Sequence, residues 1–150
     1  KLLFNVFNVF RDRQITKKIT KDKGKYRVLK SRNLSKDGSI INIGGYDSYT
    51  DNISKLAVSK FLNKENIVIA PNLSYYPRAG FLPKNSIADG SLAILTPKNH
   101  SQKITKKQLE YFSTEEFEKF YRIARHYGTR SLNIDSNSVF FWGLLKENLS

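Results

Sequence analysis

The side chains best suited to chemistry lie together in one segment, SYYPRAGFLPKNSIADGSLAIL (74–95). Tyr and Arg stack on bases, and Arg also donates hydrogen bonds to phosphate and to the major-groove edge of guanine. Two prolines stiffen this segment, which reduces the entropy that it would lose on docking. The pattern predicts nucleic-acid contacts from Tyr75, Tyr76, Arg78, Lys84 and Asn85. The structural alternative is that the aromatic residues fill the core and that Arg78 is an internal clamp.

A second group of candidate contacts has cationic, polar or aromatic side chains near predicted turns or helix ends. The stretch from Arg11 to Lys36 holds eleven bases against two acids, so it predicts a salt-sensitive grip on phosphates. The tyrosines beside Gly44-Gly45 could equally belong to the core, and the arginines of the last helix could equally form a solvated face. The group consists of Arg11, Arg13, Lys30, Ser31, Arg32, Asn33, Tyr46, Tyr49, Arg125 and Arg130.

The chain as a whole is strongly basic. Its 26 Lys and Arg residues exceed its 13 Asp and Glu residues, which gives a formal net charge of +13 on 150 residues. Such a charge repels itself in the folded state and accelerates encounter with a polyanion. Lysine-rich compositional drift is the alternative, because 18 of the bases are Lys. No apolar stretch approaches the roughly 20 residues that a membrane span needs, so we expect no membrane partner.

Residues for self-contained catalysis or metal binding are scarce. The two histidines, His100 and His126, are far apart in the chain, and cysteine is absent, so no zinc site is predicted. No glycine-rich phosphate loop with its lysine is present. A magnesium-dependent nuclease that uses Asp89, Glu116 or Asp135 stays open as a less favoured alternative.

The elements that must position these residues indicate an α+β class. Apolar runs predict mixed or antiparallel strands in the first two-thirds, at 2–10, 26–29, 40–43, 67–70 and 86–96. The first of these is apolar on both sides, so we expect it to be buried on both faces. Helical spacing and capping signals predict helices near 53–63 and within 105–127, and a final strand is expected near 139–145.

Three blocks together resemble a known family: GKYRVLKSRNL…DGSI (24–40), the 74–95 segment, and FSTEEFEKFYRIARHYGTRSLNID (112–135). They look like the target-recognition domain of type II restriction–modification adenine-specific DNA methyltransferases. The order of elements is also similar to the recognition domains of type I specificity subunits. The resemblance covers roughly residues 4–145. Together with the lack of methionine, it leads us to expect a single domain, 1–150, from the C-terminal part of a longer methyltransferase.

The resemblance implies a parent protein that transfers a methyl group from S-adenosylmethionine to adenine in duplex DNA. The family's catalytic motif, (Asn/Asp/Ser)-Pro-Pro-(Tyr/Phe), is absent here, because Pro71 is followed by Asn72 and no Pro-Pro occurs. The chain itself is therefore expected to bind no cofactor and to methylate nothing.

The partners that the resemblance implies are double-stranded DNA and an upstream methyltransferase domain of the same polypeptide, in the bacterial cytoplasm. The charge would equally permit an RNA-binding module, which stays open as the alternative to DNA recognition.

Overall fold

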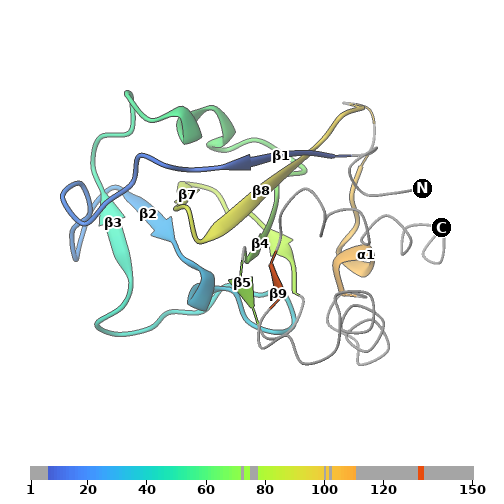
Figure 1. The fold of residues 1–150 in the computed structure, drawn as a ribbon, viewed down its shortest axis with the longest axis horizontal. Coiled ribbons are helices and arrows are strands. Elements are labelled where there is room, and N and C mark those ends of the chain that lie inside the picture. Colours follow the sequence, from blue (N-terminus) through green and yellow to red (C-terminus); the bar gives the residue numbers. More distant parts are fainter. Residues whose placement is uncertain are drawn as a thin grey trace.

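A computed structural model describes residues 7–71, 73–74, 78–99, 101, 103–110 and 132–133 (Figure 1). Within these ranges the chain forms short strands, two 3-10 helices (η2 and η3) and one short α-helix. In chain order they are β1 (Phe7–Arg11), β2 (Tyr26–Leu29), η2 (Ser31–Asn33), β3 (Ser48–Thr50), η3 (Ala57–Phe61), β4 (Val68–Pro71), β5 (Leu73–Ser74), β6 (Gly80–Phe81), β7 (Ser86–Ala88), β8 (Leu92–Pro97), α1 (Lys106–Glu110) and β9 (Leu132–Asn133).

The strands form two main sheets. The larger has the order β1-β8-β4-β6, with every neighbouring pair antiparallel. The smaller has the order β3-β2-β7, in which β2 is antiparallel to β3 and parallel to β7. A short antiparallel pair joins β5 to β9. Because β7 and β8 are consecutive but belong to different sheets, the turn at Asp89-Gly90 carries the chain from one sheet to the other.

One hydrophobic core joins the two sheets. Val28 of β2 and Ile87 of β7 pack in the same cluster as Ile69 of β4 and Ile94 of β8, and each of these side chains is at most 1% exposed. Removing such side chains from water is the main favourable term that keeps the sheets together. Phe61 of η3 belongs to this cluster, so the 57–61 segment covers the core.

The strands predicted at 26–29, 67–70 and 86–96 are confirmed, with the last divided into β7 and β8. The helix predicted near 53–63 is present only as the shorter 3-10 helix η3, Ala57–Phe61, and not as an α-helix. Backbone N–H groups of Leu56, Ser59 and Leu62 each donate to the carbonyl three residues earlier, which is the 3-10 pattern. The apolar periodicity of this segment reflects burial of Ile53 and Phe61 rather than an α-helix.

Two strand predictions also need correction. In the described part of 2–10, Phe7 is buried but Asn8 and Val9 are exposed, because β1 is an edge strand of its sheet. Residues 41–43 are not a strand, and Ile40 forms only an isolated bridge with Leu34. Hydrogen bonds with side chains, rather than the ladder of a strand, hold this segment in position.

The described residues are thus rich in strands, in mixed and antiparallel sheets as predicted, with little helix. Of the helix predicted within 105–127, the structure describes only α1, Lys106–Glu110. The rest of that helix and the strand predicted near 139–145 lie outside the described residues. In the part of the chain that is placed, no helix is long and apolar enough to cross a membrane.

Candidate nucleic-acid interface

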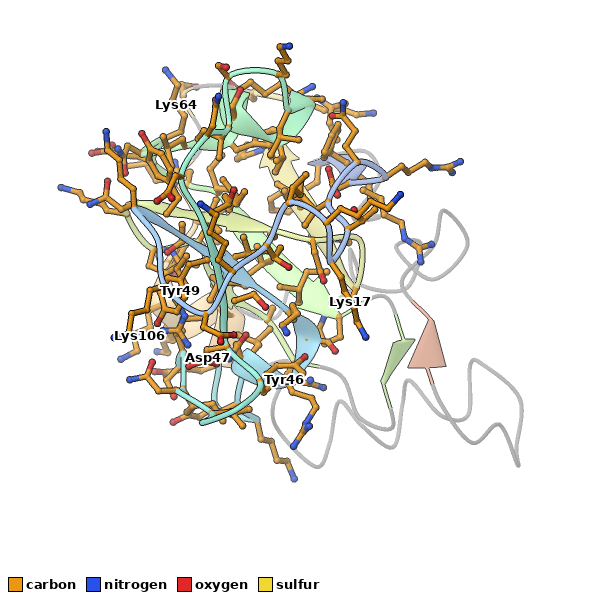
Figure 2. The ribbon with its side chains drawn as sticks, turned by 90° about the vertical axis from the view of Figure 1, so that its left-hand side faces the viewer. Lys17, Tyr46, Asp47, Tyr49, Lys64 and Lys106 are labelled. Carbon is orange, nitrogen blue, oxygen red and sulfur yellow. The ribbon has the colours of Figure 1, made fainter. Side chains whose placement is uncertain are left out.

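The strands β2 and β3 and the loops on either side of them form one end of the molecule (Figure 1), and the sequence gives these loops and β3 many cationic residues and two tyrosines. Figure 2 looks at this end and shows Lys17, Tyr46 and Tyr49 on it. We call it the basic face and define it by Lys17, Lys21, Lys25, Lys30, Arg32, Tyr46 and Tyr49.

The loop between β1 and β2 is anchored at both ends. At its start, the buried carboxylate of Asp12 accepts hydrogen bonds from the backbone N–H groups of Gln14 (3.1 Å) and Ile15 (2.8 Å). At its other end, the backbones of Lys21 and Tyr49 exchange two hydrogen bonds of 2.7 and 2.8 Å. The residues between these anchors, Lys17 among them, are therefore held between two fixed points of the loop.

An exposed ion pair joins this loop to the end of β3. Lys21 Nζ lies 2.9 Å from Asp51 Oδ2. This hydrogen bond, aided by the backbone N–H of Lys25, holds the pKa of the Asp51 carboxyl below its usual value. Exposed pairs of this kind contribute little stability, so the backbone bonds to Tyr49 matter more for the loop's position.

Lys30, Arg32 and Tyr46 form a second feature of the basic face, which we call the Tyr46 cluster. Lys30 Nζ lies 3.9 Å from the centroid of the Tyr46 ring, and Arg32 Cζ lies 4.8 Å from it. Lys30 Nζ also donates to the Tyr46 carbonyl oxygen, and the Arg32 backbone N–H donates to Tyr46 Oη at 3.3 Å. The negative face of the ring thereby offsets part of the repulsion between the two cations.

The loop that carries Tyr46 is fixed by the next residue, Asp47. Its Oδ2 accepts the backbone N–H of Ile43 at 3.0 Å, and its Oδ1 accepts the Asn33 amide at 2.6 Å. Arg27 Nη2 lies 3.4 Å from Oδ2 and donates to the Ile41 carbonyl at 2.8 Å. These bonds replace the strand ladder that the sequence predicts for 40–43.

Arg78 lies inside the protein, with only 7% of its surface exposed. Its Nε donates to the Leu34 carbonyl at 2.7 Å, and its Nη2 donates to the Ser31 carbonyl at 2.8 Å. Both carbonyls flank η2, so the guanidinium ties the two ends of this turn to β6. This geometry agrees with the internal clamp rather than with a base contact.

Close backbone packing reinforces this attachment. A Cβ on Gly80 would lie 2.2 Å from the Gly38 carbonyl oxygen, so only glycine fits there. Gly38 itself has a φ of +87°. The turn around it is fixed by Asp37, whose carboxylate accepts hydrogen bonds from the hydroxyls of Ser35 and Ser39, and these bonds lower its pKa well below the usual range.

The predicted contact residues fall into distinct classes. Asn33 is fully buried like Arg78, and its amide bonds to Asp47 and Ile41, so in this conformation neither side chain is available to DNA. The exposed ones are Arg11, Arg13, Arg32, Lys84 and Asn85, and the half-buried ones are Lys30, Ser31, Tyr46 and Tyr49. Tyr75, Tyr76, Arg125 and Arg130 lie outside the described residues.

The structure brings only some of these residues together. Lys30, Arg32 and Tyr46 meet, whereas Asn85 lies at a separate corner, where its N–H donates to Asn63 and its carbonyl accepts from the start of β2. The roles of Arg27 and Asp47 were not predicted. An aspartate just after a Gly-Gly turn is a signal that could have indicated Asp47, because such side chains commonly bond to nearby backbone.

One hollow lies elsewhere on the surface. The turn 37–40, residues 79–81 and α1 line a cleft of about 390 Å³ that is open to solvent. Within the described ranges no three His, Cys, Asp or Glu side chains are placed to share a metal ion. Asp89, one of the carboxylates considered for nuclease chemistry, instead accepts hydrogen bonds from the backbone and hydroxyl of Ser91.

Comparison with known proteins places the fold but not a sequence family. No family model matches the chain, and no curated protein matches it in sequence. Among solved structures it is similar to the S subunit of a type I restriction–modification system from M. genitalium, with 15% sequence identity and a TM-score of 0.52. The similarity covers 93% of this chain and 32% of that one, so the chain spans about a third of the length of the S subunit.

Proposed function

We propose that this chain is a target-recognition domain of a restriction–modification system and that it binds duplex DNA sequence-specifically. The observation that carries the proposal is the similarity of nearly the whole chain to part of an S subunit. The basic face supports it independently, because a polyanion would neutralise the charge that gathers there.

Two kinds of contact are expected from the basic face. Exposed lysines such as Lys17 and Lys21 lie on an anchored loop and suit phosphate contacts, which fix the position of a protein on the duplex. Sequence must be read by other side chains that reach the base edges. Tyr49 on β3 is the described candidate for that role on the basic face, and the exposed Lys84 and Asn85 remain candidates at the separate corner.

The methylation partner belongs to the same proposal. We infer that the chain acts with an adenine-specific DNA methyltransferase, which binds S-adenosylmethionine and flips the target base. The absence of a Pro-Pro motif in the sequence supports a division of labour in which this chain selects the site and another domain of the same polypeptide methylates it. The bacterial cytoplasm is the compartment that such a system requires.

The proposal is tested by measuring the affinity of the 150-residue chain for a random-sequence DNA duplex at several salt concentrations. The logarithm of the association constant should fall linearly with the logarithm of salt concentration. Selection of bound duplexes from a random pool should then enrich one short motif. Absence of duplex binding at low salt, or an affinity independent of salt, would contradict the proposal. Stronger competition by structured RNA than by duplex DNA would favour the RNA-binding alternative.

A matched pair of lysine variants locates the binding surface. Lys17→Ala removes a charge from the basic face. Lys98→Ala removes one charge just beyond β8, next to the end of β1 where Phe7 pairs with Pro97. The loop between β1 and β2, which carries Lys17, begins at the opposite end of β1. Only Lys17→Ala should lower affinity and the salt slope. Equal losses from both variants would show that charge acts without a defined surface.

A further inference from the structure

The Tyr46 cluster has the arrangement of an anion-binding site that is formed before its ligand arrives. Lys30 and Arg32 lie within 5 Å of one aromatic ring, and within the described ranges neither is paired with a carboxylate. Lys30 is fixed by its bond to the Tyr46 carbonyl. Arg32 is exposed. Two cations held close together without a counterion favour binding of a shared anion.

The geometry favours a phosphate over a base as that anionic partner. The ring of Tyr46 already contacts two cations of the protein, and their charge favours an anion over a neutral base at this place. The neighbouring glycines leave space for a bulky backbone, because a Cβ on Gly44 or Gly45 would meet no atom within 4 Å. An exposed guanidinium beside an ammonium matches the charge and the several acceptor oxygens of a phosphodiester.

Asp47 places a negative charge next to the cluster, which by itself would oppose binding of a phosphate. Its carboxylate is however engaged by three donors, the Ile43 N–H, the Asn33 amide and Arg27. The side chains of Asp47 and Arg27 are 14% and 19% exposed, so this charge is largely withdrawn from the surface. Asn33 in turn accepts the backbone N–H of Lys30 at 3.1 Å, so Asp47 is linked to the cluster through Asn33.

We propose that the Tyr46 cluster binds one backbone phosphate of duplex DNA and that Asp47 is the positioning residue that holds the cluster for this contact. The inference rests on the proposed function and deepens it by separating a phosphate contact from base reading. It can be tested without knowledge of the recognised sequence, because a phosphate contact is independent of sequence.

The first test is Arg32→Ala, measured on several unrelated duplexes over 50–200 mM salt. Loss of one phosphate contact should reduce the salt slope by about 1, which removes a factor of roughly 3.5 from the affinity change over that range. The loss of affinity should be the same for every duplex. A loss confined to one sequence would make Arg32 a base reader, and an unchanged slope would remove it from the interface; either result overturns the proposal.

The second test compares Asp47→Asn with Asp22→Asn, which removes the same charge from an exposed site in the loop between β1 and β2. If charge alone matters, both variants should bind DNA more tightly. If Asp47 positions the cluster, Asp22→Asn should raise affinity whereas Asp47→Asn should lower both affinity and salt slope. The slope is informative because a smaller folded fraction changes the apparent affinity but not the number of ions released. Tighter binding by Asp47→Asn would overturn its positioning role.

Two controls keep the outcomes distinct. If Asp47→Asn does not fold, as judged by its thermal transition, Tyr46→Leu takes its place; it removes the ring and hydroxyl, and should lower the slope as Arg32→Ala does. A slope unchanged by Tyr46→Leu would then overturn the proposal. Failure of the unmodified chain to bind any duplex would refute the proposed function itself, whereas normal binding with an unchanged Arg32→Ala slope would refute only this inference.

Discussion

Arg32 and Arg78 have the same side chain and are both predicted from sequence to contact DNA, but the fold gives them opposite surroundings. Arg32 is exposed beside Tyr46. Arg78 is 7% exposed, and its guanidinium donates to the carbonyls of Ser31 and Leu34. The two residues are nevertheless linked, because those carbonyls flank the turn that carries Arg32.

The difference shows that an arginine's role depends on which acceptors the fold places within reach. The carbonyl that follows a short helix has no helical partner, and a guanidinium has five donors in a fixed plane, so Arg78 can bond the Leu34 carbonyl and at the same time add a second donor to the Ser31 carbonyl, which already accepts the Leu34 N–H. A buried charge is tolerated only when it is bonded in this way. The buried arginine therefore sets the position of the turn, and the exposed arginine on that turn is free to meet a ligand.

The largest expected effect comes from the buried arginine. Arg78→Ala should lower the free energy of unfolding by about 3 kcal/mol, because two buried carbonyls lose a charged donor and a space opens beside β6. Arg32→Ala should change it by less than about 0.5 kcal/mol. Urea denaturation of both variants measures the contrast. Equal stability losses would show that burial does not distinguish the two arginines.

A second contrast compares Gly80, near the buried Arg78, with Gly44, near the Tyr46 cluster. Gly80→Ala would place a Cβ 2.2 Å from the Gly38 carbonyl oxygen and 2.8 Å from Leu34 Cδ1. Because backbone must shift to relieve this overlap, we expect a loss of about 2 kcal/mol in unfolding free energy. Gly44→Ala meets no atom within 4 Å and should change stability by less than about 0.5 kcal/mol. A stable Gly80→Ala protein would mean that the turn and β6 can separate without cost.

Much of the strand framework could be predicted from the sequence, because apolar runs such as 67–70 are buried and bounded by turn residues. The helix predicted at 53–63 forms only as the shorter 3-10 helix, for a physical reason. Ile53 and Phe61 face the core as their spacing suggests, but Ala57 is exposed and Val58 is buried instead, and a 3-10 path accommodates this arrangement. A long-range bond from Ala57 N–H to the Gln14 side chain, at 2.7 Å, also ties this segment to a distant loop.

The candidate site was predictable in composition but not in arrangement. The abundance of bases between Arg11 and Lys36 indicated an anionic partner, yet nothing local in the sequence shows that Asn33 is buried or that Asp47 is its partner. Those roles follow from the pairing of β2 with β3, which brings Arg27 opposite Tyr49 and thereby close to the 41–47 loop. Contacts between residues so far apart in sequence are set by the tertiary fold, which local patterns do not encode.

In the turn around Gly38, the smallest expected effect on stability comes from Asp37. Its exposed carboxylate accepts hydrogen bonds from Ser35 and Ser39. These bonds lower its pKa in the folded state, so its contribution to stability is present above the unfolded-state value of about 4 and is lost as the pH falls toward the lowered one. The stability difference between the unmodified chain and Asp37→Asn should therefore shrink between about pH 5 and pH 2. Ser39→Ala removes one hydroxyl donor and should weaken this pH dependence without abolishing it. A difference that stays constant over this range, measured by urea denaturation, would mean that these hydrogen bonds do not favour the carboxylate over the acid, and that the turn is held by the Gly38–Gly80 packing alone.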